Sequence, residues 1–207
     1  MYSLADSAIK THCPRSVSDE ERARAQIYRL LATVLSDAPS DELLAGLAAL
    51  EGDDTPLGRA SKDLSRLASR TNAKDVSLEF NALFVGLGRG ELLPYASYYL
   101  TGFLNEKPLA DLRSDLMARG IQRNDGVVEP EDHIGTLCEV MAGLITDEYG
   151  CASDVDAQKE FFDAHLSAWA KLFFTDLEGA QNAVFYGPVG SLGRVFMDVE
   201  ADAFAIQ

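Results

Sequence analysis

The stretch EPEDH, at residues 129–133, combines three carboxylates with one of the three histidines of the chain. Carboxylates beside a histidine can form an acid–base pair, bind a metal ion or bind a cationic ligand. A second stretch, LPYASYY at residues 93–99, places three tyrosines after a proline. Tyrosines offer broad apolar faces with hydroxyl tips, which are common where proteins bind peptides. Alternatively, this stretch is a half-buried helix start whose tyrosines pack against neighbours.

Catalysis and metal binding are the weaker interpretations of EPEDH because their companion motifs are missing. HExxH and CxxC, which bring zinc ligands together, do not occur, and neither does the G-x-S-x-G turn of a serine nucleophile. Asp132 and His133 could still serve as an acid–base pair in an all-α hydrolase, although nothing supplies an oxyanion hole. We therefore expect no enzyme activity, no catalytic residue and no metal site.

EPEDH also fits the beginning of a helix. Pro130 suits the first helical position, and Glu131 and Asp132 would then lie in the first turn, where the helix dipole favours carboxylates. Asp132 and Glu139 are seven positions apart and would share a face opposite the apolar stripe. That face could be solvated, or it could be an acidic surface that another segment approaches. His133 follows Glu129 by one turn, a spacing at which a glutamate raises the pKa of a histidine and orients it.

Two further features have structural interpretations. The segment GLGRG, at residues 86–90, differs from the G-x-G-x-x-G fingerprint and lacks the lysine and hydroxyl residue of a P-loop. We interpret residues 85–95 as a glycine-rich central loop that could act as a hinge beside a cleft.

His165 and Trp169 are four residues apart on one expected helix, and we expect a core tryptophan with a hydrogen-bonded histidine.

The elements that must position these residues are helical along nearly the whole chain. Apolar residues recur at helical spacing, and no alternation typical of a strand has useful length. Helix starts are indicated by a capping box of Ser18 with Glu21, by Ser40 and Asp154 as N-caps, and by prolines. Helical segments are expected near residues 18–37, 40–50, 56–67, 76–84, 95–104, 108–120, 130–150, 154–173, 180–186 and 189–204. We expect one all-α domain of about ten helices over residues 1–207, with residues 1–17 poorly ordered.

The composition narrows the class of partner. The chain of 207 residues has 33 acidic and 18 basic side chains, a net charge of −15, which repels nucleic acid and attracts cationic segments. No window approaches the roughly 20 apolar residues of a membrane span, and no secretory signal begins the chain. Cys13, Cys138 and Cys151 have no paired spacing and suit free thiols in a reducing cytoplasm. We expect a cytoplasmic protein without a nucleic-acid partner and without stable membrane insertion.

Two motifs, in order, resemble the TorD/DmsD branch of the TorD–DmsD–NarJ redox-enzyme maturation chaperones. The E-P-x-D-H motif of that family, with a glutamate six residues after the histidine, is matched by Glu129, Pro130, Asp132, His133 and Glu139. The F-x-G-x-G loop that leads to P-Y-x-S-x-Y is matched by Phe84, Gly86, Gly88, Pro94, Tyr95, Ser97 and Tyr99. The resemblance covers most of the chain from about Ser18 onward.

The resemblance implies a cytoplasmic, cofactor-free chaperone with a TorD-like fold. Such a chaperone binds the twin-arginine signal peptide, and often the body, of a molybdopterin-containing oxidoreductase until cofactor insertion and maturation are complete. The residues implied to line the peptide cleft are Pro94, Tyr95, Ser97, Asp132 and His133. Weak guanine-nucleotide binding, and either a monomer or a dimer formed by exchange of helices, are implied by the resemblance alone.

The residues and the resemblance agree on the chemistry of the cleft. A twin-arginine peptide needs carboxylates for its guanidinium groups and an aromatic, apolar groove for the stretch that follows. The carboxylates would be Asp132, Glu139 and Glu129, and the groove would be formed by Pro94, Tyr95 and Tyr99. A NarJ-like chaperone of a non-exported subunit remains the alternative, and the client enzyme is not identified by the sequence.

Overall fold

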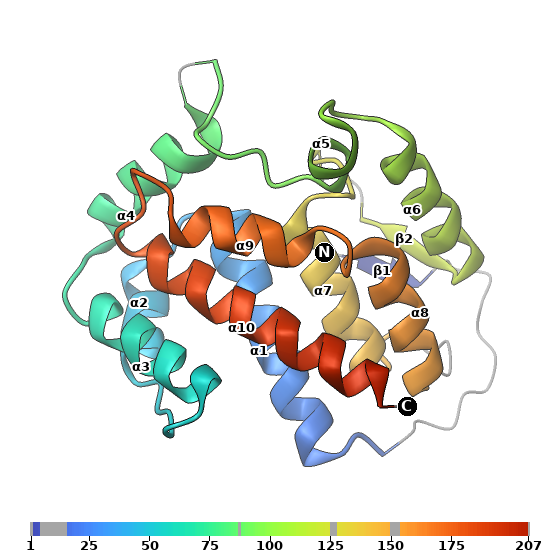
Figure 1. The fold of residues 1–207 in the computed structure, drawn as a ribbon, viewed down its shortest axis with the longest axis horizontal. Helices are drawn as coiled ribbons and strands as arrows, with labels where there is room; N and C mark the ends of the chain where they lie inside the picture. Colours follow the sequence, from blue (N-terminus) through green and yellow to red (C-terminus); the bar gives the residue numbers. More distant parts are fainter. Residues whose placement is uncertain (1, 5–15, 87, 125–127, 150–153, 207) are drawn as a thin grey trace. The chain divides into compact units, whose positions relative to one another are not determined.

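The computed structural model describes residues 2–4, 16–86, 88–124, 128–149 and 154–206. Within these residues the fold is all-α, as predicted, with ten α-helices (Figure 1). The helices are α1 (Asp19–Ser36), α2 (Asp41–Ala48), α3 (Pro56–Ala68), α4 (Ala73–Phe80), α5 (Ala96–Thr101), α6 (Lys107–Ala118), α7 (Ile134–Ile145), α8 (Val155–His165), α9 (Ala170–Glu178) and α10 (Tyr186–Ala205). A π-helical turn, η1 (Asn81–Val85), follows α4.

Two short strands accompany the helices. β1 (Tyr2–Leu4) pairs antiparallel with β2 (Ile121–Arg123), with Tyr2 opposite Arg123. The sequence did not predict them, because three residues are too few to show the alternation of a strand. β1 falls within residues 1–17, where we expected poor order, and residues 1 and 5–15 of that segment lie outside the described residues.

The helices form two compact units, each assembled from two separate segments of the chain. The first unit contains Met1–Ser36 and Tyr95–Ala168, and the second contains Asp37–Pro94 and Trp169–Gln207. The chain passes from the second unit to the first after Pro94, at the end of the glycine-rich loop. A single domain with a hinge at residues 85–95 stays a prediction.

Helix α7 is the centre of the first unit and packs against α1 and α8. Eleven of its 12 residues are buried, all except Glu139. A helix that is buried on every side needs apolar or small residues around its whole circumference, and the sequence of α7 meets this requirement. A Cβ atom added at Gly135 would lie 2.6 Å from the Ser36 hydroxyl of α1, and one added at Gly143 would lie 2.4 Å from the Tyr149 ring. The solvated second face is therefore the wrong alternative, because other segments of the same chain cover it.

The start of α7 was predicted four residues too early. Residues 130–133 form a turn instead of a first helical turn, with a 3.2 Å bond from the His133 N–H to the Pro130 carbonyl. Helix α7 begins at Ile134, and His133 is its N-cap. Proline and carboxylates suit a turn before a helix as well as the first turn inside it, so the sequence pattern did not distinguish the two.

The helix predicted to continue from Asp154 to Phe173 is interrupted. The carbonyl oxygen of Phe162 accepts the N–H groups of both Leu166 and Ser167, at 2.9 Å each, and α8 ends at His165. Trp169 is the N-cap of α9, so His165 and Trp169 do not share a helix. Trp169 is nevertheless a buried core residue, as expected.

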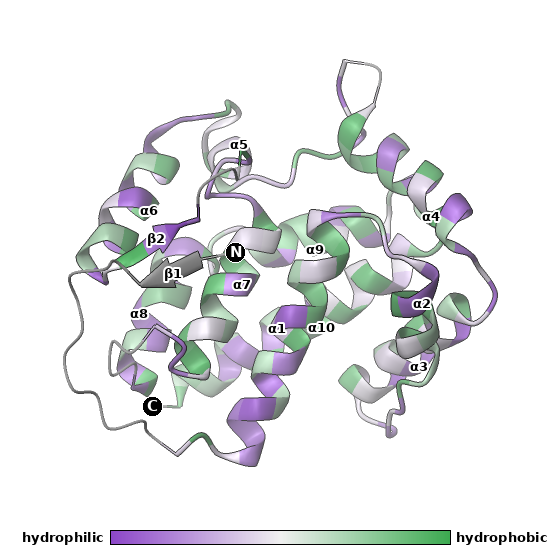
Figure 2. Ribbon diagram, turned by 180° about the vertical axis from the view of Figure 1, so that it is seen from behind, coloured by the Kyte–Doolittle hydropathy of each residue, from purple (hydrophilic) through white to green (hydrophobic). Residues whose placement is uncertain are grey.

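In the first unit, α1 begins with the predicted capping box. The N–H of Ser18 donates to the Glu21 carboxylate at 2.9 Å, and the N–H of Glu21 donates to the Ser18 hydroxyl at 3.1 Å. Figure 2 shows hydrophilic residues over the first turns of this helix. The capping box therefore marks a true helix start, since it satisfies two N–H groups that have no helical partner.

In the second unit, α10 packs along α9 and α3. Residues 180–185, which we predicted to be helical, form a turn that two carboxylates hold. Glu79 accepts the N–H groups of Val184, Phe185 and Tyr186 at 2.8, 3.0 and 2.7 Å. Glu91 accepts those of Gln181 and Asn182 at 2.6 and 3.1 Å. These bonds from distant glutamates replace the helical hydrogen bonds that the segment would otherwise make.

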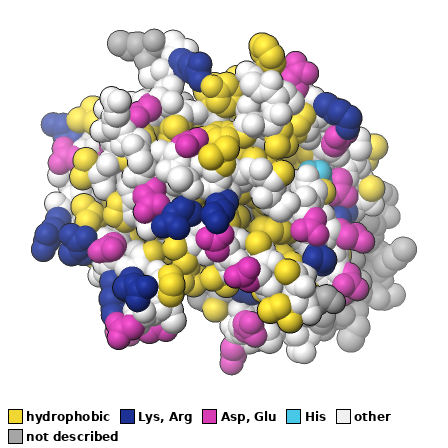
Figure 3. Space-filling view, in the orientation of Figure 1, with side chains coloured by type: hydrophobic (Ala, Val, Ile, Leu, Met, Phe, Trp, Pro, Cys, Tyr) yellow, Lys and Arg dark blue, Asp and Glu magenta, His cyan; other side chains and the backbone are white. Residues whose placement is uncertain are grey.

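The surface has charges of both signs. On the face that Figure 3 shows, acidic and basic side chains are interspersed, with hydrophobic side chains between them. Three large apolar side chains are exposed around the end of α5: Leu100 (45%), Phe103 (69%) and Leu104 (44%). Isolated apolar residues are common on surfaces, whereas a group of neighbouring ones indicates a binding surface.

Candidate functional site

The two motif segments lie side by side in the first unit. Tyr95 and His133 form an antiparallel bridge, and the Ala96 N–H donates to the carbonyl oxygen of Asp132 at 3.0 Å. A carboxylate oxygen of Asp132 accepts the Ser97 N–H at 2.9 Å. Asp132 thereby caps α5, because the helix's own N-cap residue, Tyr95, makes no side-chain capping bond. The structure thus brings together the two stretches that we expected to form one cleft.

Tyr95 joins the segments a second time through its side chain. Its hydroxyl donates to the Glu129 carboxylate, and its ring packs edge-on against the His133 ring with 5.3 Å between centroids. Burial, together with the negative charge of Glu129, raises the pKa of the Tyr95 hydroxyl. The hydroxyl therefore stays protonated and remains a hydrogen-bond donor at physiological pH.

His133 is buried, with 6% of its surface exposed, and is neutral. Burial lowers its pKa from 6.5 to about 4, and the charge of Asp132 offsets only part of that effect. Its Nδ1 accepts the N–H of Gly135 at 3.1 Å, so the ring proton of the neutral form lies on Nε2. The expectation that Glu129 raises the pKa of His133 and orients it is wrong, because Glu129 bonds Tyr95 instead.

A pocket of about 100 Å³ adjoins this site, between α5, α6, α7 and α8. Its apolar walls are formed by Ala96, Leu100, Pro108, Leu112, Leu137 and Ala164. Asp111, Asp132 and His165 are its polar lining residues. Asp132 therefore contributes to both places: it bonds the backbone of α5 and it lines the pocket.

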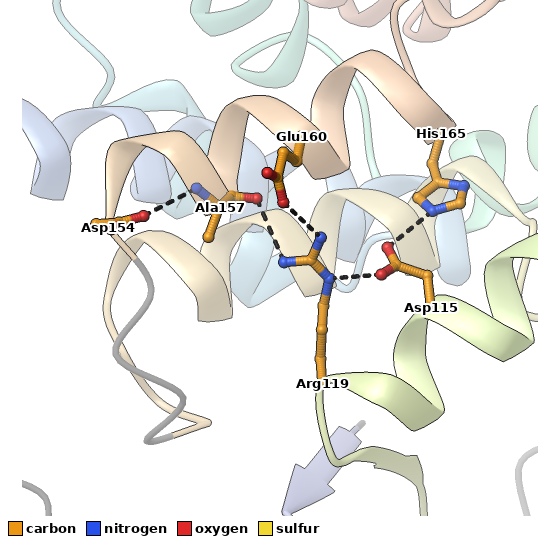
Figure 4. Close-up of polar contacts among 6 residues, drawn as sticks. All are labelled: Asp115, Arg119, Asp154, Ala157, Glu160 and His165. Atoms are coloured by element: carbon orange, nitrogen blue, oxygen red, sulfur yellow. Dashed lines mark hydrogen bonds and ion pairs between the residues drawn. The ribbon is translucent and has the colours of Figure 1, made fainter.

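A polar network joins α6 to α8 beside this pocket (Figure 4). His165 Nε2 lies 3.0 Å from one Asp115 oxygen, and Arg119 Nε donates to the other at 2.9 Å. Arg119 also donates to the Ala157 carbonyl at 3.4 Å. Burial alone would raise the pKa of Asp115, but the bonds from His165 and Arg119 outweigh it and lower that pKa. His165 is hydrogen-bonded to a neighbour, as expected.

Sequence reasoning missed the role of Glu131. Its carboxylate accepts two bonds from Arg113 of α6, at 2.9 and 2.7 Å, and lies 3.6 Å from Arg123 of β2. Burial opposes ionisation of Glu131, yet the bonds from Arg113 lower its pKa. No spacing in the sequence could have revealed this cluster, because its three members come from three elements. Glu131 is thus already neutralised and is not a free carboxylate for a ligand.

Comparison with known proteins identifies the family. Residues 50–175 match the family model described as nitrate reductase delta subunit. The chaperone protein TorD of Vibrio cholerae serotype O1 (El Tor Inaba) is 31% identical over 170 residues, which cover 72% of this chain and 77% of that one. The chain belongs to the TorD family of redox-enzyme maturation chaperones. The resemblance of the chain to this family is therefore confirmed.

A second relative agrees with this family, and a solved structure agrees with the fold. A TorD chaperone of Vibrio atlanticus is 26% identical over 203 residues, 88% of this chain and 94% of its own. A solved structure from Archaeoglobus fulgidus, described as a redox enzyme maturation protein, has the same fold, with a TM-score of 0.56 at 17% identity. It covers 84% of this chain and 93% of that chain. The TorD-like fold is confirmed.

Among the described helices, none is both long enough and apolar enough to span a bilayer.

The residues expected to line the TorD-family cleft occupy different environments. Tyr95 is half-buried and Glu129 is exposed, whereas Asp132 and Ser97 are buried. The Ser97 hydroxyl accepts the Glu106 N–H at 3.3 Å, so this serine holds the segment after α5. Tyr99 is half-buried, with its ring edge-on to Tyr98 at 6.0 Å. Pro94 is the last residue of the second unit, and its role in the cleft stays a prediction.

Glu139 does not accompany Asp132. It lines a separate hollow with Arg29, Thr33 and Glu148, on the side of α7 that faces α1. The seven-residue spacing failed as a guide because Asp132 precedes the helix instead of lying on it. The structure therefore separates the expected guanidinium ligands into two places.

The described part of the chain holds no cluster of three or more histidine, cysteine or acidic side chains suited to a metal ion. Cys138 is a buried free thiol on α7, and burial raises its pKa, so it is a poor nucleophile. Cys13 and Cys151 lie outside the described residues. In the motif site, Asp132 and His133 are engaged in capping α5 and α7, which is a structural use of both groups.

Proposed function

We propose that this chaperone binds the twin-arginine signal peptide of a molybdopterin-containing oxidoreductase in the cytoplasm, before cofactor insertion and export. The observation that carries the proposal is the convergence of Tyr95 and Glu129 on the buried pair Asp132 and His133. Tyr95 and Glu129 have exposed surface with which to contact a peptide. Asp132 and His133 hold the two backbone segments behind them.

Glu129 is the carboxylate with which a peptide arginine can pair. A guanidinium group donates two parallel hydrogen bonds to a carboxylate, a geometry that lysine does not reproduce. The Tyr95 hydroxyl is the present partner of Glu129, and an incoming arginine would share the carboxylate with it. The Tyr95 ring adds a face on which a guanidinium can stack. Together they form a small acidic and aromatic surface.

No catalytic step and no cofactor belong to this proposal. His133 uses Nδ1 to accept the Gly135 N–H, and Asp132 uses a carboxylate oxygen to accept the Ser97 N–H. A hydrolase that used this pair would have to break both helix caps. The relatives named as chaperones support a binding function instead.

The test is a titration of the full chain with a synthetic peptide that carries an Arg–Arg pair followed by leucines and alanines. Glu129→Gln should weaken binding by about tenfold, the effect of losing roughly 1.4 kcal/mol from a charge-assisted pair. Asp63→Asn is the matched control, because Asp63 is an exposed acid that pairs with Arg66 on α3. Equal effects of the two substitutions would contradict the site.

A second peptide separates the twin-arginine client from the alternative, a non-exported subunit of a molybdenum enzyme. In this peptide, lysines replace both arginines. We expect weaker binding of the lysine peptide to the wild type, and no difference between the peptides in Glu129→Gln. Equal affinity of the wild type for both would favour the non-exported client.

A further inference from the structure

The proposed arginine site does not use the pocket between α5, α6, α7 and α8. Its walls are mostly apolar, and its volume of about 100 Å³ is below the range of pockets that hold drug-sized ligands. A cavity of this size suits one apolar side chain and is too small for a folded element. The exposed Leu100 belongs both to the pocket and to the apolar group at the end of α5. The pocket therefore opens on a surface that already favours an apolar ligand.

The charges around the pocket restrict the ligand further. Its described lining includes two carboxylates, Asp111 and Asp132, and no lysine or arginine. Asp111 is exposed and pairs with Lys107 one turn earlier on α6, an exposed pair that a ligand cation can exchange at small cost. The third polar lining residue, His165, is held by Asp115. An apolar side chain with a positive charge nearby fits these surroundings, whereas an anion does not.

The walls of the pocket are fixed before any ligand arrives. Two bonds bridge α6 and α8 (Figure 4): His165 Nε2 lies 3.0 Å from Asp115, and Arg119 donates to the Ala157 carbonyl at 3.4 Å. Asp132 fixes the start of α5. A preformed pocket loses little conformational entropy on binding, so its contacts contribute to affinity and to side-chain selectivity.

We propose that this pocket seats one large apolar side chain, leucine or phenylalanine, of the stretch that follows the arginine pair, while Asp111 pairs with a basic side chain of the same peptide. This inference rests on the proposed function, because the ligand is the same peptide. Asp132 connects the two places: it lines the pocket and is bonded to the segment that carries Tyr95. The arginine surface and the apolar pocket are two subsites of the protein that bind one extended peptide.

Ala164→Phe tests the pocket by filling it. Ala164 is exposed on α8 and lines the pocket, so the substitution should block the pocket without disturbing the core. Ala45→Phe is the matched control, an exposed alanine within α2 of the second unit. For the Arg–Arg peptide with a leucine stretch, Ala164→Phe should raise the Kd by about tenfold and Ala45→Phe by less than about twofold.

A double-mutant comparison identifies the group that enters the pocket. Serine in place of each leucine of the peptide, one at a time, should weaken binding to the wild type at one position. At that position it should cause no further loss in Ala164→Phe, because the two changes then remove the same contact. Additive losses at every position would overturn the proposal. Leu100→Gln, at the exposed mouth of the pocket, repeats the test if Ala164→Phe does not fold.

The outcomes also separate this inference from the proposed function. If the wild type binds the peptide and Glu129→Gln weakens it while Ala164→Phe and Leu100→Gln do not, the pocket inference fails and the arginine site stands. If the wild type does not bind the peptide, both fail. Asp111→Asn should weaken the Arg–Arg peptide severalfold, and an unchanged affinity would remove Asp111 from the second subsite.

Discussion

His133 joins two parts of the site through a single neutral ring. Its Nδ1 must be unprotonated to accept the Gly135 N–H, and its ring packs against Tyr95. A proton on Nδ1 would remove that acceptor and would also place a charge in a buried position. Asp132 is the neighbouring charge that favours the proton, and it does not outweigh the burial. The histidine of the motif therefore behaves as a helix cap that acid disrupts.

We expect the free energy of unfolding to fall as the pH is lowered from about 6.5 to about 4. In this window the unfolded chain binds a proton at His133 and the folded chain does not. The stabilisation is thus fully present above the unfolded pKa and is lost as the pH falls toward the folded pKa. The loss assigned to His133 should be about 3 kcal/mol.

His133→Asn is the control for this pH dependence, because asparagine accepts an N–H at an N-cap but does not titrate in this range. Urea unfolding of both proteins at several pH values measures the difference in stability. The advantage of the wild type over the variant should shrink between pH 6.5 and pH 4. A difference that is constant with pH would contradict the assignment.

Helices α9 and α10 owe their close packing to two glycines of α10. A Cβ atom at Gly190 would lie 2.4 Å from the backbone nitrogen of Glu178 and 2.8 Å from the Phe174 carbonyl oxygen. One at Gly193 would lie 2.2 Å from the Phe174 ring. Glycine weakens a helix by itself, so its presence at these two positions is explained by the approach of the neighbouring helix.

Gly190→Ala should destabilise the protein by about 1–3 kcal/mol, because backbone atoms of α9 would have to move away. Gly46→Ala provides the opposite case. Gly46 lies within α2, and an added Cβ atom there meets nothing within 4 Å. Alanine should therefore stabilise that helix by about 0.5–1 kcal/mol. Thermal or urea unfolding measures both, and a shift of the same sign at the two glycines would contradict the packing argument.

The net charge of −15 belongs to the chain as a whole and not to one patch. Glu131, Asp115 and Glu178 are paired with arginines, and the face in Figure 3 mixes both signs. Local pairing leaves the long-range field negative, because acidic side chains outnumber basic ones. Such a field steers cationic ligands toward the protein and acts mainly on the rate of association.

The association rate of an Arg–Arg peptide should fall by about tenfold between low and high salt, while the dissociation rate changes little. Stopped-flow fluorescence with a labelled peptide measures both rates. A peptide with glutamines in place of the arginines should show a much weaker dependence on salt. An equal dependence for the two peptides would mean that the field does not steer the arginine pair.

The all-α class and several helix starts could be predicted because they depend on local patterns. Ser18 with Glu21 forms the expected capping box, Ser40 caps α2, and Asp154 caps α8. The errors lie where distant segments meet. Residues 130–133 became a turn because they pair with the segment at Tyr95, and residues 180–185 became a turn because Glu79 and Glu91 hold their N–H groups.

The types of residue at the site were evident from the sequence: an acidic and histidine-containing motif, a tyrosine-rich motif, and an excess of negative charge. Which groups these residues contact was determined only by tertiary packing. Burial lowered the pKa of His133 where local spacing predicted an increase, Arg113 neutralised Glu131, and α7 separated Glu139 from Asp132. Hydrogen bonding within a helix follows the order of residues along the chain. Desolvation and ion pairing depend on neighbours that chain order does not specify, so the folded structure was needed to assign them.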